Sequence, residues 1–142
     1  MIVTEPTYVG KILLIEENPG DVRLTKEMFK EAGFYGTYYV ATDGTEAVDF
    51  LCQRDNYIDA PHPDIIFLDW HFPRKSGEEV LTKVNSDESL KQIPVIVLTG
   101  TESELYDLQS DDPGADGYVL KPLEPDDLIR IVQSFSLNQA IE

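Results

Sequence analysis

Short apolar runs alternate with amphipathic stretches five times along this chain. The runs are KILLIEE (11–17), TYYVA (37–41), DIIFLD (64–69), PVIVLT (94–99) and GYVLK (117–121). They are too short for helices and continuous rather than alternating, which is typical of strands covered on both faces of a sheet. The pattern therefore predicts five buried strands.

Helical patterns follow each of these runs. In four of them apolar residues recur at the spacing of one helix face, which predicts helices packed against the sheet. The predicted inward-facing stripes are Leu24, Met28 and Ala32; Ala47, Val48 and Leu51; Val80, Leu81 and Val84; and Leu128, Val132 and Phe135.

Capping signals mark where several of these helices begin. Ser76 with Glu79, and Thr101 with Glu104, have the spacing of a capping box, in which each residue bonds to the backbone of the other. Pro125 stands at a first-turn position of the last helix, where its missing N–H costs nothing. Gly33 is the stop signal of the first helix.

Five strand–helix units in a row predict an α/β fold with a parallel sheet, right-handed crossovers and helices on both faces. The 142 residues suit one domain. We expect this domain to span residues 10–136, with a short N-terminal extension at 1–9, a C-terminal tail at 137–142 and no output domain.

The chain is strongly acidic, with 27 Asp and Glu against 11 Lys and Arg. Phosphate backbones and anionic membranes repel such a chain, so we expect neither a nucleic acid nor a membrane as partner. No apolar run approaches the roughly 18 residues of a membrane span. The first ten residues lack the basic start and apolar stretch of a secretory signal. Together with the single Cys52, these features favour a cytoplasmic location.

The ends of the predicted strands carry the candidate chemistry. In an open α/β sheet, ligands bind beyond the carboxyl ends of the strands, so these side chains should lie along one edge. They are three carboxylates, one hydroxyl and one ammonium group: Glu16, Glu17, Asp69, Thr99 and Lys121.

This combination suits phosphoryl transfer. Three neighbouring carboxylates repel each other, and an all-oxygen site that relieves the repulsion with a cation suits Mg²⁺ better than Zn²⁺, with Mn²⁺ as a further candidate. An ionised Asp69 needs no general base to act as a nucleophile, so it can accept a phosphoryl group directly. The cation and Lys121 would neutralise the charge of that group, and Thr99 offers a donor to one of its oxygens.

Four segments carry a resemblance to a known family. ILLIEENPGD, IIFLDWHFPRKSG, VIVLTGT and GADGYVLKP together resemble the receiver domain of two-component response regulators, over about residues 10 to 136. ENPGDVRL with PRKSG is most similar to stand-alone receivers, including those paired with bacterial phytochromes. The resemblance implies a doubly wound, flavodoxin-like sheet of strand order 2-1-3-4-5 flanked by five helices. It also implies a Lys121–Pro122 peptide bond of the cis form common in this family.

The resemblance implies a role for each residue at the predicted metal and phosphoryl site. Asp69 matches the phosphoacceptor, and Glu16 and Glu17 match the acidic pair that binds Mg²⁺ directly or through water. His71 would give its backbone carbonyl to the metal. Lys121 matches the family's lysine. The pair is usually Asp-Asp or Glu-Asp, so the longer Glu17 alters the expected metal distance.

Two further matches concern the response to phosphorylation. Thr99 and Tyr118 match the switch pair, in which the hydroxyl moves toward the phosphoryl group and the aromatic ring turns inward. His71 and Thr101 stand at positions that flank the path of the attacking water and modulate the phosphoryl lifetime.

The resemblance implies signalling by protein contact. The expected partners are a sensor histidine kinase, a downstream effector or phosphotransfer protein, and a second copy in a homodimer. The chain would catalyse only its own phosphorylation and dephosphorylation. The alternative is a degenerate receiver that docks partners without being phosphorylated.

Two other classes fit less well. A phosphatase of the haloacid dehalogenase type needs its nucleophile at the first strand and an acidic residue two positions later. In this chain the residue two positions after Asp69 is His71, which is not an acid. A flavodoxin-like cofactor carrier would place a phosphate against Glu16, Glu17 and Asp21, which would repel it.

Overall fold

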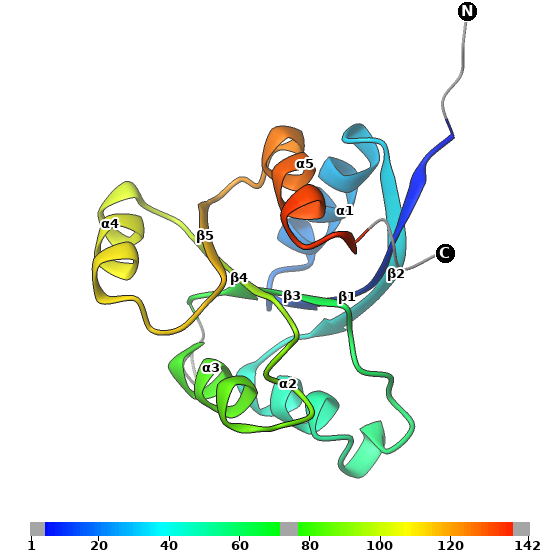
Figure 1. Cartoon of the computed structure of the whole chain (residues 1–142), viewed down its shortest axis with the longest axis vertical. Coiled ribbons are helices and arrows are strands. Elements are labelled where there is room, and N and C mark those ends of the chain that lie inside the picture. The colour runs from blue at the N-terminus through cyan, green and yellow to red at the C-terminus, as the bar shows by residue number, and fades with distance from the viewer. Residues whose placement is uncertain (1–4, 72–76, 138–142) are drawn as a thin grey trace, which may run out of the picture.

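The computed structural model describes residues 5–71 and 77–137 of the chain. Within these ranges five strands and five α-helices alternate along the chain (Figure 1). The strands are β1 (Thr7–Ile15), β2 (Phe34–Ala41), β3 (Ile65–Asp69), β4 (Val95–Thr99) and β5 (Gly117–Leu120). The helices are α1 (Pro19–Glu31), α2 (Gly44–Leu51), α3 (Gly77–Ser86), α4 (Glu102–Asp111) and α5 (Pro125–Ser134), with a 3₁₀ turn at Asp55–Tyr57.

The five strands form one parallel sheet in the order β2-β1-β3-β4-β5, which confirms the predicted topology. Every residue of β3 and β4 is buried. Burial on both faces is the reason that these strands are continuous apolar runs in the sequence. Because the chain moves outward from β1 to β2 and then crosses to β3 on the other side, a crevice is expected at the carboxyl ends of β1 and β3.

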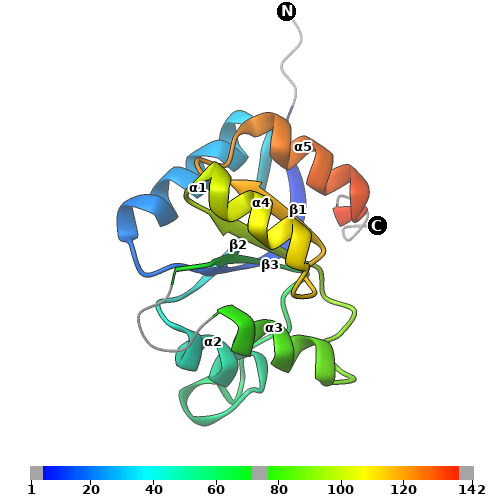
Figure 2. The same cartoon turned by 90° about the vertical axis from the view of Figure 1, so that its left-hand side faces the viewer.

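Helices cover both faces of the sheet. In Figure 1, α1 and α5 lie on one side and α2 and α3 on the other, while α4 lies beside β5. Figure 2 shows α4 from the front, between these two layers. On the α1 side, the ring of Phe29 makes edge-to-face contacts with Tyr38 and Phe67, with ring centroids 5.7 Å apart in both pairs. Such contacts fix the angle at which α1 crosses the sheet.

Helix starts are fixed by side chains close to the predicted site. The Asn18 side chain accepts hydrogen bonds from the backbone N–H groups of Gly20 and Asp21, at 2.8 and 3.3 Å, and thereby begins α1 directly after the end of β1. Thr101 caps α4 in the same way by accepting from the N–H of Glu104 at 3.1 Å. Ser76, the predicted cap of α3, lies outside the described residues.

Four of the predicted apolar stripes can be compared with the structure. The α2 and α3 stripes are buried as predicted, and so are Leu128 and Val132 of α5. The α1 stripe is wrong at Leu24, whose side chain is 43% exposed. Phe29 is the buried residue of this helix, and its ring packs edge-to-face on Phe67 of β3, while Met28 and Ala32 are partly buried against the same core.

The sheet extends beyond the predicted domain limits. β1 begins at Thr7, pairs there with Phe34 of β2, and buries Val9 completely. Residues 7–9 therefore belong to the sheet, although the sequence pattern placed them in an extension. Leu137, the first residue of the predicted tail, packs on the core that α1 and α5 cover. Among the described helices, none has the length and apolar character that crossing a membrane requires.

Candidate functional site

Lys121 binds three carboxylates at the carboxyl edge of the sheet. Its Nζ lies 2.9 Å from Oδ2 of Asp21, 3.1 Å from Oε1 of Glu16 and 3.4 Å from Oδ2 of Asp69. Glu16 and Asp69 are buried, with 7% and 6% of their surfaces exposed. The structure therefore brings Glu16, Asp69 and Lys121 together, as their positions at strand ends predict.

Backbone hydrogen bonds continue the sheet beyond the strand ends and fix these side chains. The N–H of Glu16 donates to the carbonyl of Ala41 at 2.9 Å, and that of Lys121 donates to the carbonyl of Thr99 at 2.7 Å. The N–H of Trp70 donates to the carbonyl of Leu98 at 3.0 Å. The residues of the site are consequently held by the ladder of the sheet rather than by free loops.

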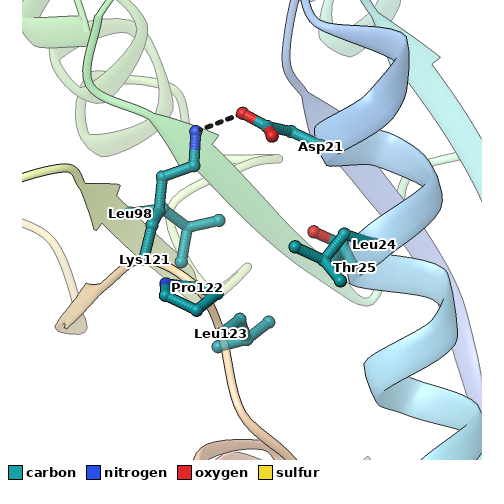
Figure 3. A pocket seen from close by; sticks show the side chains of 7 residues that line it. All are labelled: Asp21, Leu24, Thr25, Leu98, Lys121, Pro122 and Leu123. Carbon is teal, nitrogen blue, oxygen red and sulfur yellow. Dashed lines mark hydrogen bonds and ion pairs between the residues drawn. The ribbon is translucent and has the colours of Figure 1, made fainter.

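Asp21 is a site residue that the sequence analysis did not assign. It lies in the first turn of α1, which the Asn18 cap directs toward Lys121. The only sign of this role in the sequence was an acidic residue in the first turn of the helix that follows Glu16 and Glu17. Figure 3 shows the Asp21 carboxylate pointing from α1 to the ammonium group of Lys121.

Negative charge exceeds positive charge in this cluster. Burial, and then the hydrogen bond with Asp69, raise the pKa of Glu16 to about 7, although Lys121 acts in the opposite direction. Burial also acts to lower the pKa of Lys121, but hydrogen bonds to Asp21 and Glu16 outweigh burial and hold that pKa above its ordinary value. At neutral pH, Lys121 is thus charged while Glu16 is partly protonated.

The predicted metal carboxylates are brought together only in part. Glu16 and Asp69 interact directly, whereas Glu17 is exposed. Across residues 5–71 and 77–137, His, Cys, Asp and Glu side chains form no group of three or more that could hold a metal ion. The two buried carboxylates nevertheless fit a hard cation, because they are oxygen donors whose mutual repulsion contributes to the raised pKa of Glu16.

Thr99 and His71 both contact Glu104, which the sequence predicted as part of the α4 capping box. The Thr99 hydroxyl, completely buried, donates a hydrogen bond to Oε1 of Glu104. Nε2 of His71 lies 2.9 Å from the same oxygen, and the His71 backbone N–H donates to Oδ1 of Asp69 at 3.3 Å. Glu104 was predicted to close a capping box with Thr101; its N–H does so, but its carboxylate turns to Thr99 and His71.

Tyr118 contacts the opposite end of α4. It is partly buried against the core that α2 and α3 cover, and burial raises the pKa of its hydroxyl. Its hydroxyl donates to Oδ1 of Asp112 at 2.9 Å and accepts from the N–H of Ala115 at 3.3 Å. Thr101 is exposed, and the Lys121–Pro122 peptide bond is cis, as the resemblance implies.

A cleft of about 270 Å³ opens beside Lys121, between α1 and the segment that follows β5 (Figure 3). The exposed Leu24 and the cis Pro122 lie on its apolar wall. Asp21 and Lys121 form its polar end, so the cleft leads from solvent to the charged cluster.

Comparison with known proteins shows the family to which the chain belongs. The family model described as the response regulator receiver domain matches residues 12–133. The chain is 35% identical over 122 residues to response regulator Rcp1 of Synechocystis sp. (strain ATCC 27184 / PCC 6803 / Kazusa), and the match covers 86% of this chain and 83% of Rcp1.

Two solved structures are similar over most of their length. The Mn²⁺-bound form of response regulator Rcp1 has a TM-score of 0.68 and 33% identity, with 92% of each chain covered. The phosphorylated cyanobacterial phytochrome response regulator RcpA has a TM-score of 0.72 and 34% identity, with 93% of this chain and 95% of that chain covered. This chain therefore belongs to the response regulator receiver domain family, the phosphoryl-accepting signalling domains of two-component systems.

Proposed function

We propose that Asp69 accepts a phosphoryl group from a sensor histidine kinase in a Mg²⁺-dependent reaction. The observation that carries this proposal is the position of the Asp69 carboxylate, which is buried at the end of β3 beside Glu16 and 3.4 Å from Lys121 Nζ. RcpA, a relative of this chain, is known in a phosphorylated form. The gathered residues do not favour a degenerate receiver that only docks partners.

The proposed step is a direct displacement. An oxygen of the Asp69 carboxylate attacks the phosphorus atom of a phosphohistidine, and a P–O bond forms as the P–N bond breaks. The bonding electron pair stays on the imidazole nitrogen, which takes a proton from solvent. Lys121 is already held within reach of Asp69 by Asp21 and Glu16, so its charge needs no rearrangement to stabilise the acyl phosphate.

Glu16 and Asp69 are the proposed direct ligands of the metal, with exposed Glu17 acting through water and His71 contributing its backbone carbonyl. Oxygen ligands suit Mg²⁺ and also Mn²⁺, the ion in the Rcp1 structure. When bound, the cation neutralises negative charge on the phosphoryl oxygens. Binding requires the proton on Glu16 to leave, and a pKa of about 7 allows this at neutral pH.

The signal would leave by protein contact. Phosphorylation-dependent binding of a downstream effector, transfer to a phosphotransfer protein and homodimer formation are the three proposed routes. We further propose a cytoplasmic location, no binding of nucleic acid, and catalysis limited to the chain's own phosphorylation and dephosphorylation. Thr101 and His71 are the positions proposed to modulate the phosphoryl lifetime.

Intact-mass measurement after incubation with acetyl phosphate and Mg²⁺ tests the proposal. The wild type is expected to gain the mass of one phosphoryl group, and Asp69→Asn none. Asp64→Asn is the matched control, since Asp64 precedes β3 at the opposite edge and binds the N–H of Lys11 at 2.7 Å. It should label like the wild type. Labelling of Asp69→Asn, or an unlabelled wild type, would contradict the proposal.

A further inference from the structure

Glu104 links two residues at the rim of the Asp69 site. Its Oε1 accepts the hydrogen bond from the Thr99 hydroxyl and lies 2.9 Å from Nε2 of His71. The backbone N–H of His71 in turn donates to Asp69 at 3.3 Å. The carboxylate is only 22% exposed, whereas the His71 side chain is 63% exposed. Glu104 therefore contacts a buried hydroxyl on one side and an exposed imidazole on the other.

The Thr99 hydroxyl cannot serve two acceptors at once. A hydroxyl carries a single proton, so a bond donated to Glu104 withholds that proton from a phosphoryl oxygen. Thr99 is completely buried at the end of β4, so solvent does not offer its hydroxyl a replacement acceptor. Donation to Glu104 and donation to a phosphoryl group on Asp69 are consequently alternative arrangements of the same side chain.

Charge adds to this competition. A phosphoryl group on Asp69 brings about −1.5 to −2 charge into a region that already contains Glu16, Asp21 and Glu104. The nearest described ammonium group, Lys121, is already shared among three carboxylates. Like charges in a partly buried site repel strongly, which favours withdrawal of the Glu104 carboxylate.

We propose that Glu104 is a positioning residue that holds the Thr99 hydroxyl in the unphosphorylated arrangement and releases it when Asp69 is phosphorylated. This proposal rests on the proposed function, because it specifies what opposes the phosphorylated state at the same site. It predicts that removing the Glu104 carboxylate favours the phosphorylated arrangement. Because Glu104 lies in the first turn of α4, its release also removes the contact between that turn and Thr99 at the end of β4.

Binding of beryllofluoride, a phosphoryl mimic, tests the proposal by titration calorimetry of the full chain at saturating Mg²⁺. Glu104→Ala is expected to bind about tenfold more tightly than the wild type, since a hydrogen bond to a charged acceptor is lost only from the unliganded state. Glu102→Ala, the same truncation of an exposed acid in the same helical turn, should bind within about twofold of the wild type.

Removal of the Thr99 hydroxyl distinguishes the proposed contact from a general effect of charge. Thr99→Ala is expected to weaken binding, and the gain from Glu104→Ala should disappear in the double variant. A gain of equal size in the Thr99→Ala background would overturn the proposal. Circular dichroism identifies a Glu104→Ala chain that does not fold, and Glu104→Gln, a weaker uncharged acceptor of similar shape, then takes its place with an expected gain of about threefold.

The two proposals fail in different ways. A wild type that does not bind beryllofluoride overturns the proposed function and this inference with it. A wild type that binds, together with Glu104→Ala and Glu102→Ala variants of equal affinity, overturns only the role of Glu104.

Discussion

The Tyr118 hydroxyl donates a 2.9 Å hydrogen bond to Oδ1 of Asp112, the residue that caps the carboxyl end of α4. Asp112 adopts a left-handed conformation with φ 44°, which turns the chain back toward β5. At the other end of the same helix, Thr99 bonds to Glu104. Both residues of the predicted switch pair are thus connected to carboxylates of α4 or its cap.

Tyr118→Phe is expected to lower the free energy of unfolding by about 1 kcal/mol, because it removes the bonds to Asp112 and Ala115 while keeping the ring. Tyr106→Phe makes the same change on a side chain that is 70% exposed and should shift stability by less than about 0.5 kcal/mol. Urea denaturation measures both. Equal losses in the two variants would show that the hydroxyl of Tyr118 contributes nothing particular.

Glu16 predicts a pH dependence of stability in the absence of metal. Its pKa is raised in the folded chain from 4.5 to about 7, so between these values the unfolded chain binds fewer protons. The free energy of unfolding therefore falls as pH rises from about 4.5 to 7, by roughly 1–3 kcal/mol from this residue. Below pH 4.5 the penalty is absent, and above 7 it is fully developed.

Denaturation in EDTA at pH 5 and pH 7.5 measures this dependence. The Glu16→Gln chain, which has no carboxylate to ionise at this position, should lose less stability over the same interval. If the wild type and Glu16→Gln lost the same stability between the two pH values, a group other than Glu16 would account for the pH dependence.

Addition of Mg²⁺ should reverse the penalty, because the cation requires the ionised carboxylates that repel each other without it. The thermal midpoint is expected to rise on adding Mg²⁺, and to rise more at pH 7.5 than at pH 5.5. Asp69→Ala should lose most of this shift. A shift that is equal at both pH values would contradict proton release from Glu16 on binding.

The exposure of Glu17 predicts unequal contributions from the acidic pair. Glu17→Gln should weaken Mg²⁺ binding by about tenfold, as expected for a group that acts through water, and Glu16→Gln should weaken it further. Isothermal titration compares the two variants directly. A stronger effect at Glu17 would reverse the proposed roles.

Gly77→Ala is expected to lower the free energy of unfolding by about 1–3 kcal/mol. A Cβ at this first residue of α3 would lie 2.5 Å from Cε3 and 2.7 Å from Cζ3 of Trp70, and an aromatic ring cannot bend away. Gly100→Ala is the control, since its Cβ would meet no atom within 4 Å. Chemical denaturation measures stability, and the fluorescence of the single tryptophan should change in Gly77→Ala alone.

The strands of the sheet could be predicted because their apolar residues are consecutive in the sequence. Continuous apolar runs such as IIFLD are required wherever both faces are covered, and strand ends in parallel sheets share one edge. This reasoning placed Glu16, Asp69 and Lys121 together, while the strand order came from the family resemblance. The early start of β1 was missed because Gly10 and Lys11 separate Tyr8 and Val9 from the apolar run that follows, and a register shift lies between Tyr8 and Lys11.

Side-chain directions were harder to predict than backbone positions. Glu104 has the correct spacing for a capping box, yet its carboxylate is drawn to a buried hydroxyl in another element, and sequence spacing contains no information about that alternative. Asp21 joins Lys121 because of the angle at which α1 leaves β1. Both cases depend on tertiary packing, which decides between local options of similar energy.

Lys121 and the carboxylates that it binds come from most of the length of the described chain. Glu16 lies in the first strand–helix connection, and Lys121 follows the last strand. During synthesis, Glu16, Asp21 and Asp69 leave the ribosome well before their common cation. A nascent chain that ends before residue 121 therefore contains the proposed acceptor, Asp69, without the lysine proposed to stabilise its acyl phosphate. We therefore expect the chain to become able to accept a phosphoryl group only after residue 121 has been made and β5 has joined the sheet.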